Sequence, residues 1–83
     1  MAPQSKQTRV RKPPPKGELH VRVGALVREA RIKKGVSQAE LGAPYFTRAM
    51  VSAVELGKIS PALKTLAHFA KQLEVPLRDL IPD

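Results

Sequence analysis

Few residues of this chain are of types that make or break covalent bonds, and their spacing matches none of the usual reactions. The 83 residues include two histidines, seven acidic residues and no cysteine. His20 and His68 fall in different predicted elements without a third ligand at metal-site spacing, and no two carboxylates are spaced for a shared pocket. We therefore expect no enzyme, no catalytic residue, no bound metal and no cofactor.

The basic residues are more informative. Fifteen lysines and arginines oppose seven aspartates and glutamates, which gives a net charge of +8 and a pI near 10.5. Such an excess attracts polyanions, but charge alone leaves nucleic acid, anionic lipid and acidic protein surfaces open as partners. The sequence shows no signal peptide and no apolar run near the ~18 residues of a membrane span, which predicts a soluble, cytoplasmic protein.

The first 18 residues have the composition of a solvated arm. They contain three consecutive prolines and five basic residues, namely Lys6, Arg9, Arg11, Lys12 and Lys16. Because consecutive prolines favour an extended chain and like charges repel, residues 1–18 are predicted to be a disordered basic arm. Residues 19–83 are then the folded domain. The arm is interpreted either as a solubilising leader or as a nucleic-acid contact.

The elements that must position the remaining polar residues are predicted to be helices. From His20, apolar residues recur at helical spacing (Val23, Leu26, Val27, Ala30) until Gly35, a typical helix stop. Ser37 and Glu40 then form the capping box of a second helix. This second helix is expected to be short, because Gly42 and Pro44 disfavour its continuation.

Three further helical segments follow. Thr47 can cap a helix over residues 48–56, which Gly57 ends and in which Val51 and Val54 face inward. Ser60-Pro61 is typical of the start of the next helix, which is expected to bury Leu63, Leu66, Ala67, Ala70 and Leu73 and to expose Lys64, His68 and Lys71. After Val75-Pro76, a last turn carries Leu77, Leu80 and Ile81. The predicted fold is all-α, with five helices.

Three motifs in this order resemble a known family. They are Gly35-Val36-Ser37-Gln38-x-x-Leu41, Thr47-x-x-x-Val51-Ser52-x-Val54-Glu55-x-Gly57 and Pro61-x-Leu63-x-x-Leu66. Together they resemble the phage repressor and Cro type of helix-turn-helix domain (XRE family) over about Val23 to Ile81. The resemblance implies a compact repressor-like domain that binds double-stranded DNA with some sequence preference. It further implies a nucleoid-associated transcriptional regulator, more often a repressor, that acts as a homodimer.

The resemblance also implies which residues contact DNA. Residues 48–56 become the recognition helix in the major groove, and the implied contacts are Ser37, Gln38, Thr47, Arg48, Ala49, Met50, Ser52, Ala53 and Lys58. Arg48 can read a guanine or clamp a phosphate, and both roles stay open. Arg31 and Glu55 match positions that pair the first helix with the third.

Two departures from the family pattern bear on these expectations. The stretch between Leu41 and Thr47 is one residue short and lacks the usual turn glycine, so Tyr45 or Phe46 is expected to fill the core there. Ala49, Met50 and Ala53 offer no side-chain hydrogen bonds, which predicts modest discrimination that depends on DNA shape. The alternative is a scaffold that acts through protein contacts, such as an antitoxin or a transcription coactivator.

Two further points stay open at this stage. RNA binding is not excluded by charge, although aromatic stacking residues are scarce. Leu77, Leu80 and Ile81 are interpreted either as the dimer surface or as residues that seal the core.

Overall fold

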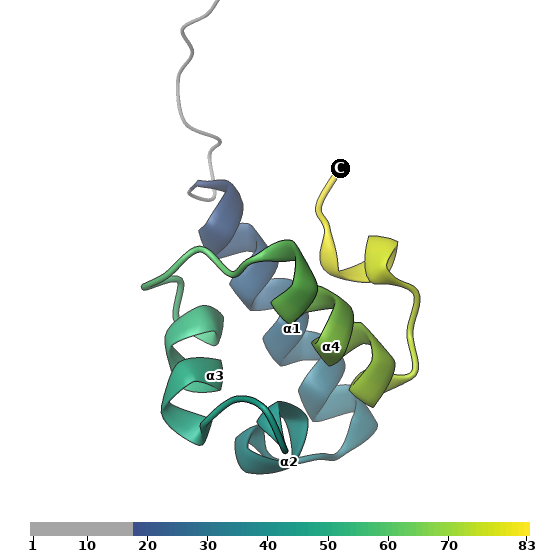
Figure 1. The fold of residues 1–83 in the computed structure, drawn as a ribbon. Helices are drawn as coiled ribbons and strands as arrows, with labels where there is room; N and C mark the ends of the chain where they lie inside the picture. The colour runs from purple at the N-terminus through teal and green to yellow at the C-terminus, as the bar shows by residue number, and fades with distance from the viewer. Residues whose placement is uncertain (1–17) are drawn as a thin grey trace, which may run out of the picture.

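Four α-helices and one short 3-10 helix make up the part of the chain that the computed structural model describes, residues 18–83 (Figure 1). They are α1 (Leu19–Lys34), α2 (Gln38–Gly42), α3 (Arg48–Glu55), α4 (Leu63–Leu73) and η1 (Leu77–Leu80). These residues form no strand, so the predicted all-α fold is confirmed. The predicted basic arm lies outside the described residues, apart from Glu18.

The helix α1 ends where the sequence predicts. Gly35 adopts a left-handed conformation, with φ of 83°, and its N–H donates to the carbonyls of Arg31 and Ile32. Glycine takes this conformation without the steric cost that a Cβ atom imposes. The last turn contains Arg31, Lys33 and Lys34, whose positive charges interact favourably with the negative end of the helix dipole.

Side-chain caps start the next two helices. Ser37 Oγ accepts a hydrogen bond from the Glu40 N–H at 3.0 Å, and the Ser37 N–H donates to Glu40 Oε1 at 2.7 Å, which confirms the predicted capping box of α2. Thr47 Oγ1 accepts from the Met50 N–H at 3.1 Å and caps α3. These bonds satisfy amides that a helix start leaves without partners, so both starts follow from local sequence.

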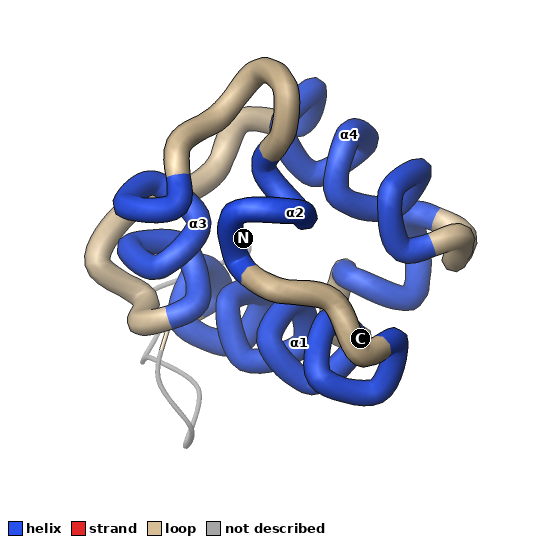
Figure 2. Tube along the Cα trace, turned by 90° about the horizontal axis from the view of Figure 1, so that it is seen from below, coloured by secondary structure: helices blue, strands red, loops and turns tan. Residues whose placement is uncertain are grey.

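One hydrophobic core holds the helices together. In Figure 1, α1 and α4 lie side by side, α3 packs against α1, and α2 lies at the lower end of the molecule. Figure 2 looks onto that end, where α2 contacts α3 and α4. Every helix contributes to the core, which consists of Val23, Val27, Leu41, Val51, Val54, Leu66, Phe69, Ala70, Leu73 and Leu80. Val51 and Val54 are fully buried, as their spacing predicts.

The buried face of α4 differs in part from the prediction. Leu66, Ala70 and Leu73 are buried as expected, but Leu63 is 67% exposed and Ala67 is also exposed. Phe69 is fully buried instead, together with Thr65. A rotation of the helix that buries Phe69 rather than Ala67 removes more apolar area from water, which explains the difference.

The predicted start of α4 at Ser60-Pro61 is wrong. The first helical residue is Leu63, and Ala62 precedes it in an extended conformation with no side-chain cap. Pro61 is half-buried and lines a small hollow together with Leu19, Val23 and Ile81. Pro61 therefore lies beside α1 and precedes the helix, and no side-chain cap starts α4.

The C-terminal turn mainly closes the core. Leu80 is fully buried and Leu77 packs partly against the core. Of the two interpretations that the sequence allows, these two residues therefore fit sealing of the core and not an open dimer surface. Ile81 is the most accessible of the three, with 38% of its surface exposed. Within residues 18–83, no helix is long and apolar enough to cross a membrane, and no group of three His, Asp or Glu side chains is placed to hold a metal ion.

Candidate nucleic-acid interface

A buried ion pair connects α1 to α3. Arg31 Nε donates to Glu55 Oε2 at 2.6 Å, and Arg31 Nη2 donates to Glu55 Oε1 at 3.1 Å. Only 15% of the arginine side chain and 1% of the glutamate side chain are exposed. A carboxylate removed from water requires charged or hydrogen-bonding partners, and the two-pronged geometry of arginine supplies both.

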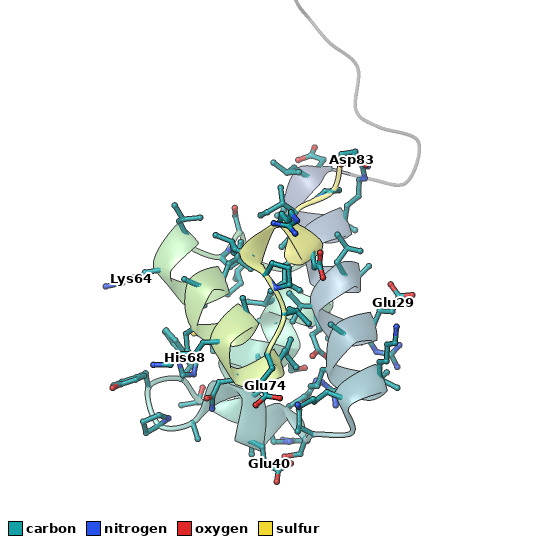
Figure 3. The ribbon with its side chains drawn as sticks, turned by 90° about the vertical axis from the view of Figure 1, so that its right-hand side faces the viewer. Glu29, Glu40, Lys64, His68, Glu74 and Asp83 are labelled. Carbon is teal, nitrogen blue, oxygen red and sulfur yellow. The ribbon has the colours of Figure 1, made fainter. Side chains whose placement is uncertain are left out.

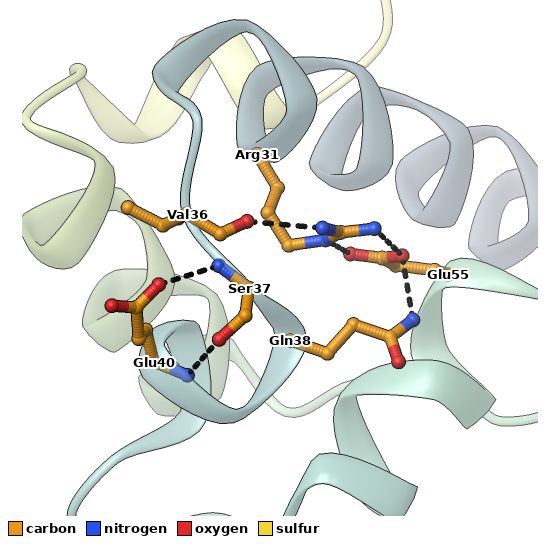
Figure 4. A network of polar contacts seen from close by, with 6 residues as sticks. All are labelled: Arg31, Val36, Ser37, Gln38, Glu40 and Glu55. Carbon is orange, nitrogen blue, oxygen red and sulfur yellow. Dashed lines mark hydrogen bonds and ion pairs between the residues drawn. The ribbon is translucent and has the colours of Figure 1, made fainter.

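The same carboxylate also connects α2. Gln38 Nε2 donates to Glu55 Oε1 at 3.0 Å, and Arg31 Nη1 donates to the carbonyl of Val36 at 3.0 Å (Figure 4). Glu55 on α3 thus accepts hydrogen bonds from α1 and α2 together. Because Arg31 lies on α1 and Gln38 on α2, their bonds to Glu55 fix the orientation of α3 relative to both helices.

A glycine allows α1 and α3 to approach closely. A Cβ atom added at Gly24 would lie 2.1 Å from the carbonyl oxygen of Val54, a distance that real Cβ atoms essentially never show. The backbones of the two helices are therefore in direct contact. Side-chain pairing through Glu55 and backbone contact at Gly24 place α3 independently of each other.

The residues with implied DNA contacts lie on α3 and the segments beside it. Thr47, Arg48 and Ala49 are exposed at the start of α3, and Met50, Ser52 and Ala53 along it are half-buried. Ser37 is exposed and Gln38 half-buried at the start of α2, which the Gln38–Glu55 bond holds beside the end of α3. The exposed Lys58 follows α3 directly, and its N–H donates to the carbonyl of Ala53.

The turn between α2 and α3 is anchored by two residues of α4 whose role the sequence did not predict. The carbonyl of Ala43 accepts hydrogen bonds from His68 Nε2 at 3.0 Å and from Gln72 Nε2 at 3.1 Å. The sequence predicts that Tyr45 or Phe46 fills the core at this turn. Phe46 packs partly against the core, whereas Tyr45 is 76% exposed. No local pattern signals a contact between α4 and a turn some 25 residues away.

The helix-turn-helix family model HTH_3 matches residues 27–80. The restriction-modification controller protein C.AhdI from Aeromonas hydrophila is 32% identical over 74% of this chain and 90% of that chain, with a TM-score of 0.70. The hypothetical transcription factor NHTF from Neisseria is 31% identical over 93% of this chain and 90% of that chain, with a TM-score of 0.73.

A third similar structure is the DNA-binding domain of BldD. It is 25% identical over 77% of this chain and 94% of that chain, with a TM-score of 0.69. None of these three names describes an enzyme. No curated protein sequence matches the chain.

Proposed function

Because the chain belongs to the helix-turn-helix family of the phage repressor and Cro type, we propose that it is a transcriptional repressor that binds double-stranded DNA with sequence preference. The similar fold of a DNA-binding domain, that of BldD, supports this function. The observation that carries the proposal is the network around Glu55, because it holds α3 in one orientation with its outer face accessible. A recognition helix must be oriented in this way before it enters a major groove.

In this proposal, some side chains contact bases and others contact the phosphate backbone. Arg48 donates a pair of hydrogen bonds to guanine O6 and N7 or clamps a phosphate, while Ala49 packs on a thymine methyl group. Ser37, Lys58 and Gln38 contact the phosphate backbone. A glutamine amide carries two N–H groups, so Gln38 can keep its bond to Glu55 and donate the second N–H to a phosphate.

The test is selection of bound sequences from a random duplex pool, followed by affinity measurements against salt. We expect an enriched inverted repeat, and we expect Arg48→Ala to remove the preference at a guanine position, a loss of about 1–3 kcal/mol in discrimination. Arg78→Ala is the matched control, because it removes the same charge from the exposed Arg78 of η1. Steep salt dependence without an enriched motif would leave a non-specific phosphate binder.

A second candidate function is a helix-turn-helix scaffold that acts through protein contacts, as an antitoxin or coactivator does. It is favoured by exposed apolar residues at and after the end of α3, where Leu56 is 62% and Ile59 is 38% exposed. Absence of duplex binding at low salt would reject the first function and favour this one.

A further inference from the structure

A hollow of about 500 Å³ lies between the α2–α3 turn and the outer face of α4. Six residues line it: Tyr45, Phe46, Lys64, Ala67, His68 and Lys71. Figure 3 shows Lys64 and His68 extending from α4 on the side of the molecule opposite to Glu29. No acidic residue is among the lining side chains, so the only full charges on the wall of the hollow are those of Lys64 and Lys71.

Aromatic contacts hold the wall of the hollow in place. The Tyr45 ring lies edge-on to the His68 ring, with centroids 5.4 Å apart, and Phe46 contacts both His68 and the buried Phe69. The bonds from His68 and Gln72 to Ala43 fix the turn that carries Tyr45. A large aromatic that is exposed yet already ordered loses little entropy when a partner covers it, and such residues dominate binding energy at protein interfaces.

The two lysines bracket this apolar surface. Lys64 and Lys71 are both exposed and lie seven residues apart on α4, which separates their positions by about 10 Å along the helix axis, on one face. Ala67 and His68 lie between them. A complementary partner therefore carries negative charges at a similar spacing with an apolar side chain between them.

We propose that this hollow docks an acidic segment of another protein. A large apolar side chain of that segment packs beside Tyr45 and over Ala67, while flanking carboxylates pair with Lys64 and Lys71. Residues 1–17 of the chain itself are a poor occupant, because they contain five basic residues and no acidic residue. A duplex backbone would satisfy the lysines but would cover the apolar wall with phosphates, which gain nothing from that contact.

The experiment uses the full chain and a synthetic probe, the peptide acetyl-Asp-Glu-Phe-Leu-Glu-Asp-amide, followed by NMR titration. We expect shifts confined to residues 43–46 and 64–71. The double reversal Lys64→Glu/Lys71→Glu should weaken binding at least tenfold, as should Tyr45→Ala. The matched control Arg28→Glu/Lys33→Glu reverses the same charge on exposed positions of α1 and should leave affinity within twofold, with melting curves confirming that each variant folds.

Four results of the probe titration would overturn the proposal. They are no shifts at millimolar probe, shifts centred on α3, equal affinity in the reversal and control variants, and equal affinity for a probe with asparagine and glutamine in place of its acids. A duplex that shifts residues 64–71 and displaces the probe would assign the hollow to nucleic acid. If the protein self-associates and the Lys64→Glu/Lys71→Glu change abolishes this association, the occupant of the hollow would be a second copy of the chain. Docking here does not require DNA binding at α3, so failure of either proposal leaves the other standing.

Discussion

At the scale of single residues, Glu55 on α3 connects to both α1 and α2. Its carboxylate is almost completely buried and accepts three hydrogen bonds, two from Arg31 and one from Gln38. The net stability of such a pair is small when both partners are present, because desolvation offsets the Coulomb attraction. Its removal is costly, because the arginine then remains buried without a counter-charge.

We predict that Glu55→Ala destabilises the protein by about 3–5 kcal/mol, the range seen when one partner of a buried pair is lost. Glu29→Ala is the control, since Glu29 is exposed on α1, and its effect should stay within about 0.5 kcal/mol. Chemical denaturation of the two variants gives both values. Equal unfolding midpoints would mean that Glu55 does not hold α1, α2 and α3 together.

Glu74 gives a residue-scale prediction with a defined pH dependence. Its carboxylate accepts a hydrogen bond from Lys34, and this bond, followed by the attraction of the lysine charge, lowers the pKa of Glu74. A lowered folded-state pKa means that the pair stabilises the protein above the unfolded pKa of ~4.3, and that this stability is lost as pH falls through the folded value. We therefore expect wild type to melt above Glu74→Gln at pH 7, with the difference disappearing in acid once Glu74 is protonated in both the folded and the unfolded state. A pH-independent difference would contradict the pairing.

At the scale of elements, helix existence and capping were predictable, but the rotation of α4 and its start were not. Ser37, Thr47 and Gly35 act on neighbouring backbone groups, so their effect is visible in the local sequence. The rotation of α4 depends on which apolar side chains the other helices accept. Leu63 and Phe69 both fit a helical period, and only the core decides that Phe69 is buried.

The contact between α1 and α3 gives an element-scale prediction. Alanine within a helix usually stabilises relative to glycine by up to ~1 kcal/mol, yet Gly24→Ala should destabilise by about 3 kcal/mol, the upper end of the usual cost of overpacking, because its methyl group meets the Val54 carbonyl. Gly35→Ala is the comparison, because open space surrounds that position and only its positive φ is unfavourable, at about 1–2 kcal/mol. Thermal unfolding ranks the two variants. A larger loss for Gly35→Ala would contradict the close approach.

At the scale of the whole molecule, the DNA-binding surface that we propose for one copy is small, so we predict that two copies occupy one operator. Two-fold pairing places the recognition helices about one helical turn of DNA apart, near 34–36 Å. An inserted spacer of half a helical turn moves one half-site to the opposite side of the duplex and should weaken binding by about tenfold or more, ~1.4 kcal/mol. Titration by sedimentation reports both stoichiometry and affinity. A one-to-one complex that ignores spacing would exclude the paired arrangement.

The candidate site was predictable only through the family resemblance. Composition indicated a polyanionic partner, but it did not indicate which face of the domain meets that partner. The pairing of Arg31 with Glu55 bridges 24 residues of sequence, a separation at which local periodicity carries no information. The aromatic wall at Tyr45 and His68 lay beyond sequence analysis for the same reason.

Residues 18 and 83 leave the domain at the same end. Arg22 near the start of α1 donates to the Asp83 carbonyl at 3.4 Å, and Figures 1 and 3 show both ends on the side away from α2. A short engineered peptide bridge from Asp83 to Glu18 can therefore give a circularly permuted form of residues 18–83 whose new termini fall between the exposed residues Ile59 and Ser60. The domain is equally suited to insertion into a loop of a host protein, because its two ends lie close together and the two ends of the host loop would not have to separate far.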